Sequence, residues 1–164
     1  MRHRVDADHA NDLHNLQRFV DAQSPIHDQA LAEIRAGQKR AHWMWYVFPQ
    51  YAGLGSSPTS REFAIGSIAE AKAYLRHAVL GPRLVECAEA LLLVEGRSAH
   101  QIFGADDVKL RSCATLFARV SPPGSAFHRL LDRFFGGEPD STTLSLIERE
   151  TPTDSPAGGS SGPT

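Results

Sequence analysis

The chain has 164 residues, a formal net charge of −2, 41% hydrophobic and 22% charged residues. This length suits one domain that can bury a core without disulfides or structural metals. The slightly acidic balance argues against a nucleic-acid-binding protein, because such proteins usually carry a basic excess. Cys87 and Cys113 lie in apolar patterns without a CxxC spacing, so we expect buried thiols rather than a metal or redox site.

The composition of the two chain ends predicts the domain bounds, and the hydropathy of the chain predicts its cellular location. Residues 1–10 are polar and are expected to be flexible, residues 11–150 to form the folded domain, and residues 151–164, rich in Pro, Gly, Ser and Thr, to be a disordered tail. No apolar signal segment follows Met1, and no stretch approaches the ~20 apolar residues that span a bilayer. We therefore expect a cytoplasmic protein that does not associate with a membrane.

Apolar residues recur at helical spacing along the folded part. The fold class predicted is all-α, an irregular single-domain bundle of about eight helical segments. Hydroxyl residues followed three positions later by Glu or Gln indicate helix caps at Thr59, Ser67 and Ser98, and Asp106 or Asp107 is expected to cap the helix that follows. In chain order, helices are expected near residues 12–21, 25–36, 61–66, 68–76, 83–95, 98–104, 107–118, 125–135 and 141–149.

The segment His42–Gln50, HWMWYVFPQ, contains both tryptophans of the chain. Helical spacing and period-two spacing both place large side chains together here, so the pattern leaves open whether residues 42–48 form a helix or a strand. Pro49 ends either element. Large aromatic residues of this kind commonly build core, which is the interpretation favoured for Trp45, Val47 and Phe48.

Three residues at the ends of this segment are candidates for a ligand site. An aromatic face such as Trp43 can stack on a planar ligand, and His42 and Gln50 could remain accessible to solvent. Lys39, just before the segment, could bind phosphate or carboxylate. His42 is also a candidate catalytic residue.

Two further helix starts carry charge. Asp106 and Asp107 open a helix with Lys109 one turn later; they form either a plain N-terminal cap or a general base beside an anion-binding lysine. Arg83 stands near a helix start, where cations are unusual; it is either solvated or part of an anion site.

Standard catalytic and cofactor motifs are missing. The sequence contains no GxxxxGK[ST] loop, no GxGxxG fingerprint that opens a helix after a strand, no GxSxG elbow and no HExxH motif. Its one GxSxG string, GGSSG at residues 158–162, lies in the expected tail. The glycine-rich loop Gly53–Ser57 lacks the lysine of a phosphate loop. No metal site and no bound cofactor are expected.

Several strings in a fixed order resemble a known bacterial and fungal family. They are residues 16–23 (LQRFVDAQ), 42–50 (HWMWYVFPQ), 71–75 (AKAYL), 79–84 (VLGPRL), 102–104 (IFG) and 109–112 (KLRS). Together they resemble the domain of unknown function 1810, over about residues 12–147. The resemblance implies an all-α fold and little about function. Members often carry the label calpastatin, but inhibitors of that type are long, disordered and repeat-bearing, unlike this chain.

A weaker similarity concerns the NADAR, or YbiA-like, N-glycosidases of ADP-ribose and riboflavin-pathway compounds. It implies a hydrolase acting on an N-glycosidic bond of a nucleotide-derived (ADP-ribose/NAD-like) metabolite. Trp43 would stack on the planar leaving group, Lys39, Arg83 and Lys109 would hold phosphate, and Asp106 or Asp107 would stabilise an oxocarbenium-like transition state. The alternative is a non-catalytic module that binds a small ligand or a peptide. In either case we expect His42, Trp43 and Lys109 to line one pocket; the sequence does not indicate the oligomeric state.

Overall fold

The computed structural model describes residues 12–154. The expected flexible N-terminus, residues 1–10, and residues 155–164 of the expected tail lie outside this described part. The helix predicted over 141–149 continues to Asp154, into the segment expected to be tail.

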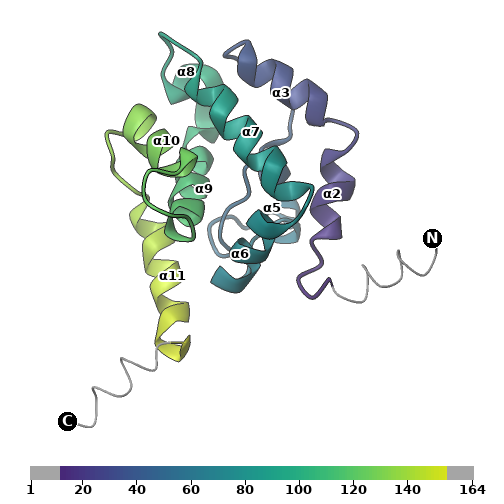
Figure 1. Ribbon diagram of the computed structural model, residues 1–164, viewed down its shortest axis with the longest axis vertical. Coiled ribbons are helices and arrows are strands. Elements are labelled where there is room, and N and C mark those ends of the chain that lie inside the picture. Colours follow the sequence, from purple (N-terminus) through teal and green to yellow (C-terminus); the bar gives the residue numbers. More distant parts are fainter. Residues whose placement is uncertain (1–11, 155–164) are drawn as a thin grey trace.

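The described chain forms one all-α domain, as the sequence predicts (Figure 1). The segment 42–48, which periodicity left open, contains a short helix. The elements are α2 (Gln17–Gln23), α3 (His27–Arg35), α4 (Met44–Val47), α5 (Pro58–Glu62), α6 (Ile68–Arg76), α7 (Leu80–Leu92), α8 (Ala99–Phe103), the 3-10 turn η1 (Gly104–Asp106), α9 (Asp107–Arg119), α10 (Ala126–Phe135) and α11 (Ser141–Asp154).

Helix α7 is central to the arrangement. It runs diagonally across the molecule in Figure 1, with α2 and α3 to one side and α9 and α10 to the other. It packs against α3, α6 and α10, and α9 packs against α8, α10 and α11. The core between these helices includes Leu91 and Phe117, whose side chains are fully buried. None of the helices in residues 12–154 is long and apolar enough to cross a membrane.

The helix caps predicted from the sequence are confirmed only in part. Ser67 and Ser98 cap α6 and α8, and Ser98 forms the full reciprocal box with Gln101. The cap expected at Thr59 is wrong, because Ser57 caps α5 and Pro58 occupies its first turn, where proline loses no hydrogen bond. Of the two candidates Asp106 and Asp107, Asp106 stands at the N-cap position of α9, but its side chain makes no cap hydrogen bond, and η1 precedes the helix.

Helix α7 begins earlier than its apolar pattern predicts, at Leu80 instead of Arg83. Pro82 fits in the first turn, where its missing N–H has no helical acceptor to lose. Gly81 permits a close approach to the preceding helix, because a Cβ atom at this position would lie 2.1 Å from the carbonyl oxygen of Leu75. Glycine is therefore required where α6 turns into α7.

Both cysteines are buried, as expected from their apolar surroundings. Burial raises the pKa of Cys87 to about 12 and that of Cys113 well above its ordinary value. The thiolate is the reactive form of cysteine, so neither side chain is a candidate nucleophile.

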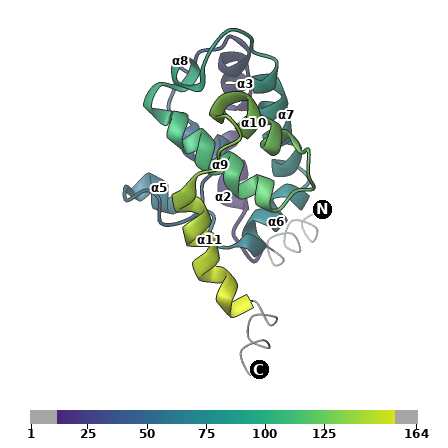
Figure 2. The ribbon, with the colours of Figure 1, turned by 90° about the vertical axis from the view of Figure 1, so that its left-hand side faces the viewer.

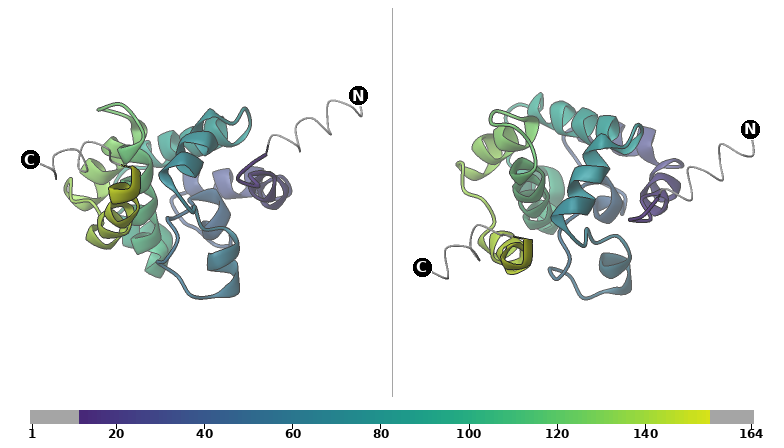
Figure 3. Two further views of the ribbon diagram at one scale, coloured as in Figure 1. Left: turned by 90° about the horizontal axis from the view of Figure 1, so that it is seen from below. Right: turned by 60° about the horizontal axis from the view of Figure 1, so that its bottom comes forward.

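The chain after α4 leaves the body of the domain and returns. Ile65 pairs with this segment on either side of Tyr51, donating to Gln50 O and accepting from the Ala52 amide, both at 2.8 Å. The loop between these contacts, together with α5, protrudes beside α11 and the start of α9 (Figures 2 and 3). This protrusion forms one wall of the site described next.

Candidate functional site

A pocket of about 260 Å³ lies between the protruding loop, α5, the end of the aromatic segment and α9. Four of its lining residues are aromatic: Trp45, Phe48, Tyr51 and Phe63. Trp45 is half-buried, whereas the other three rings are buried. Flat apolar walls of this kind suit a planar ligand.

The polar lining comes from separate elements. Gln50 is the last residue of the segment His42–Gln50, Ser60 and Arg61 belong to α5, and Lys109 belongs to α9. Two of these four side chains are cations, and none is an anion. Both cations can attract an anionic group, and one carboxylate borders the lining, because Glu150 Oε1 accepts from the Tyr51 hydroxyl.

Arg18 of α2 holds the α5 wall in place. Its guanidinium donates to the carbonyl oxygens of Glu62 (2.7 Å) and Ala64 (2.8 Å), on either side of Phe63. It also forms a 2.9 Å ion pair with the buried Glu70 carboxylate. Because Arg18 reaches two carbonyls and a carboxylate at once, it fixes where the chain re-enters the body of the domain.

The carboxylate of Asp106 binds two lysine side chains, Lys109 and Lys39. Asp106 Oδ1 accepts from Lys109 Nζ at 2.9 Å, and Oδ2 accepts from Lys39 Nζ at 3.0 Å. Burial by itself would raise the pKa of Asp106, but the hydrogen bonds and charges of Lys109 and Lys39 outweigh it and lower that pKa. Asp106 therefore stays ionised at neutral pH and is a weak proton acceptor.

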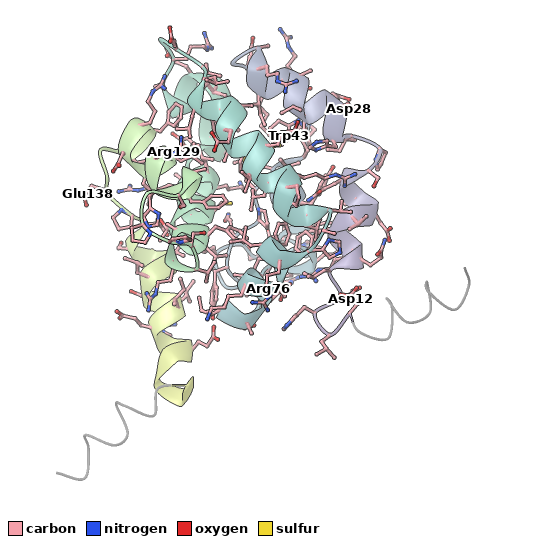
Figure 4. All side chains as sticks on the ribbon, in the orientation of Figure 1. Asp12, Asp28, Trp43, Arg76, Arg129 and Glu138 are labelled. Carbon is pink, nitrogen blue, oxygen red and sulfur yellow. The ribbon has the colours of Figure 1, made fainter. Side chains whose placement is uncertain are left out.

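Trp43 is not placed to stack on a ligand, contrary to the expectation, because it does not line the pocket. Its indole is 1% exposed, and Figure 4 places it within the outline of the helical body. The ring lies behind the pocket, with centroids 6.4 Å from both Phe48 and Phe103. Trp43 thus supports a pocket wall without reaching the ligand space.

We expected His42, Trp43 and Lys109 to line one pocket. This prediction is wrong for His42 and Trp43. His42 is exposed and lies outside the pocket lining. Its backbone carbonyl accepts from the Tyr46 hydroxyl at 3.3 Å. Lys109 lines the pocket together with Gln50, which was also a candidate.

The remaining candidates have partners elsewhere. Lys39 is 8% exposed and does not line the pocket, so it is not placed to hold a ligand phosphate directly. Asp107 lies 3.3 Å from His100 Nδ1, and Arg83 donates to Gln23 Oε1 at 3.4 Å. Neither Asp107 nor Arg83 lines the pocket.

Sequence reasoning missed Arg61 and Phe63 and favoured a core role for Trp45 and Phe48, which line the pocket. The short helix α5 has no apolar stripe that would mark its inner face, and the pocket brings it together with α9, which is far from it in the sequence. The one available signal was the loop Gly53–Ser57, since a glycine-rich loop beside aromatic residues can border a site.

Among residues 12–150, no cluster of His, Cys, Asp or Glu suits a metal ion.

A family model and a solved structure both match this chain. A family model described as "Protein of unknown function (DUF1810)" matches residues 13–147. The crystal structure of the conserved hypothetical protein Rv1873 from Mycobacterium tuberculosis is 50% identical, covers 82% of this chain and 96% of its own, and superposes with a TM-score of 0.80. No curated protein matches.

Proposed function

The chain belongs to the DUF1810 family of proteins of unknown function, and we propose that its pocket binds a small planar molecule that carries an anionic group. One observation carries this proposal: aromatic walls and the Lys109 side chain line the same cavity. Aromatic faces favour flat rings, and an ammonium at the edge favours carboxylate or phosphate. Arg61, which also lines the cavity, adds a second cation.

The size of the pocket limits the ligand. Its volume of about 260 Å³ is slightly below the range of ~300–1,000 Å³ that encloses drug-sized ligands. One ring system with one acidic group fits this space. A dinucleotide such as NAD, or ADP-ribose, would insert one end and leave the rest outside.

Hydrolysis of an N-glycosidic bond in a nucleotide-derived metabolite is the catalytic form of this proposal. Its support is Asp106, an ionised carboxylate bound to the pocket residue Lys109. Such a carboxylate can stabilise positive charge that develops on a sugar ring. Asp106 does not itself line the pocket, and both of its carboxylate oxygens already accept from lysines. Binding is therefore the better-supported function.

A matched pair of ligands tests the binding proposal. Nicotinate and nicotinamide share a ring and differ in charge, so tryptophan fluorescence should respond to nicotinate, or to a nucleoside monophosphate, more strongly than to nicotinamide. Lys109→Met should weaken the response at least several-fold. Arg119→Met, which removes an exposed cation from the same helix outside the pocket, should leave it unchanged.

Two results would count against these proposals. Equal responses to nicotinate and nicotinamide, or no response to any planar anion up to millimolar concentration, would contradict the binding function. Incubation with NAD and ADP-ribose, followed by mass spectrometry for released base or ribose phosphate, tests the hydrolase separately. Binding without products would leave a non-catalytic module.

A further inference from the structure

Lys39 carries a positive charge that is enclosed by protein. Its side chain is 8% exposed, its ammonium lies 5.3 Å from the centroid of the Trp43 ring, and its backbone amide donates to Ile102 O at 2.8 Å. A buried lysine needs a compensating partner, because its desolvation is otherwise unfavourable. Asp106 is that partner, at 3.0 Å.

Asp106 is shared between two cations that differ in exposure. The Lys39 side chain is buried, whereas the Lys109 side chain is 28% exposed and lines the pocket. Each lysine takes a different oxygen of the carboxylate. One negative charge cannot neutralise two ammonium groups, so the three residues together keep one positive charge. Lys109 presents that charge to solvent and to any ligand.

We infer that Lys39 determines the charge specificity of the pocket without touching its ligand, by engaging Asp106 and so leaving Lys109 uncompensated. The inference rests on the proposed function, since it assumes that the ligand is an anion. Without Lys39, the pair of Lys109 and Asp106 would be neutral overall, and the pocket would lose part of its attraction for anions. Lys39 is thus a positioning residue that acts through Asp106.

The inference predicts effects of opposite sign for two neighbouring substitutions. Lys39→Met removes the enclosed charge and should weaken anion attraction. Asp106→Asn removes the shared negative charge and should strengthen it. The double variant K39M/D106N leaves Lys109 as the one charge of the three, so anion attraction should return close to that of the wild type. A purely structural role for Lys39 predicts a loss in all three variants.

Quenching of tryptophan fluorescence measures this charge without knowledge of the ligand. Trp45 lines the pocket and is half-buried, whereas Trp43 is 1% exposed. The quenching slope with iodide, divided by the slope with neutral acrylamide at constant ionic strength, reports the local anion concentration at Trp45. Trp45→Phe should abolish most of the iodide response and so verify the assignment.

The expected changes are about two-fold, the effect of one unit charge several ångströms away in partly screened surroundings. The iodide/acrylamide ratio should fall about two-fold in Lys39→Met, rise about two-fold in Asp106→Asn, and return to the wild-type value in the double variant. Lys39→Arg, which keeps the charge, should stay near the wild type.

Three outcomes would overturn the inference: an unchanged ratio in Lys39→Met, a fall in Asp106→Asn, or a double variant lower than both single variants. If Lys39→Met does not fold, K39M/D106N is compared with Asp106→Asn, where equal ratios contradict a role for the Lys39 charge. Because no metabolite enters this experiment, the inferred charge pattern can hold while the ligand screen fails. A positive ligand screen can equally accompany a flat iodide ratio, so the two failures are distinguishable.

Discussion

The indole Nε1 of Trp43 donates a 2.8 Å hydrogen bond to Oε1 of Glu33. The same oxygen accepts from the backbone amides of Arg40 (2.8 Å) and Ala41 (3.1 Å), and Oε2 accepts from the Gln29 side chain at 2.9 Å. Burial would raise the pKa of Glu33, but these hydrogen bonds outweigh it and lower the pKa to about 2. Glu33 therefore anchors both Trp43 and the turn before it, behind the pocket.

Glu33→Gln should destabilise the protein in a pH-dependent way. A carboxyl whose pKa falls from 4.5 unfolded to about 2 folded contributes stability above pH 4.5, and that contribution is lost as the pH falls through 2. We expect the variant to unfold with ~2–3 kcal/mol less free energy at pH 6. The difference from the wild type should shrink towards zero near pH 2.

Urea denaturation between pH 6 and pH 2.5 measures this difference. Glu148→Gln, at an exposed position of α11, is the matched control and should change stability little at any pH. A destabilisation by Glu33→Gln that stays constant over this range would show that the hydrogen-bonded carboxylate charge is not its cause.

Arg18→Met should destabilise the domain and loosen the α5 wall. The substitution leaves the Glu70 carboxylate, 6% exposed, without its 2.9 Å partner and removes the bonds to Glu62 O and Ala64 O. We expect a loss of ~2–4 kcal/mol in the free energy of unfolding. Arg18→Lys should recover little, because one ammonium cannot reproduce the forked contacts.

Hydrogen exchange of the amides of residues 58–65 provides the second measurement for Arg18. Faster exchange there than in α9 is expected for Arg18→Met. Adding Glu70→Gln should restore part of the lost stability, since the uncompensated charge is then removed. A double variant less stable than Arg18→Met would indicate that Glu70 contributes through contacts other than this ion pair.

Much of the fold could be predicted from the sequence because it depends on local patterns. The apolar stripes of α7 and α9 and the Ser98 capping box are short-range features. The short helices α4 and α5 were harder, because four or five residues contain too little periodicity to identify a buried face. The early start of α7 was missed because Gly81-Pro82 is typical of a turn and also fits a first helical turn.

The candidate site was only partly predictable for a different reason. Lys109, Gln50 and Asp106 were identified by residue type, and two of them line the pocket. Whether Trp43 faces a ligand or the core depends on Glu33, ten residues earlier, whose carboxylate satisfies the indole N–H. The roles of Arg61 and Lys39 depend on contacts between distant segments, which one sequence does not reveal.

Leu91→Ala and Phe117→Ala should each destabilise the protein strongly. Both side chains are fully buried, on α7 and α9. Each substitution loses apolar burial and leaves a cavity, for an expected cost of ~2–5 kcal/mol by chemical denaturation. Leu93→Ala, at a position 81% exposed, is the control and should change stability by less than ~0.5 kcal/mol. Near-neutral results at both Leu91 and Phe117 would contradict the packing of α7 against its neighbours.

Gly81→Ala tests the close approach between α6 and α7. Alanine normally stabilises a helix by ~1 kcal/mol relative to glycine, so propensity alone predicts a gain. The added Cβ atom would lie 2.1 Å from the backbone carbonyl oxygen of Leu75, and backbone atoms cannot rotate away as a side chain can. We expect the clash to prevail and to lower the free energy of unfolding by ~1–3 kcal/mol. Gly66→Ala is the control, because its Cβ would meet only Glu70 Oε1, at 3.4 Å. Equal or higher stability of Gly81→Ala in thermal and urea denaturation would show that α6 and α7 separate at this junction without loss.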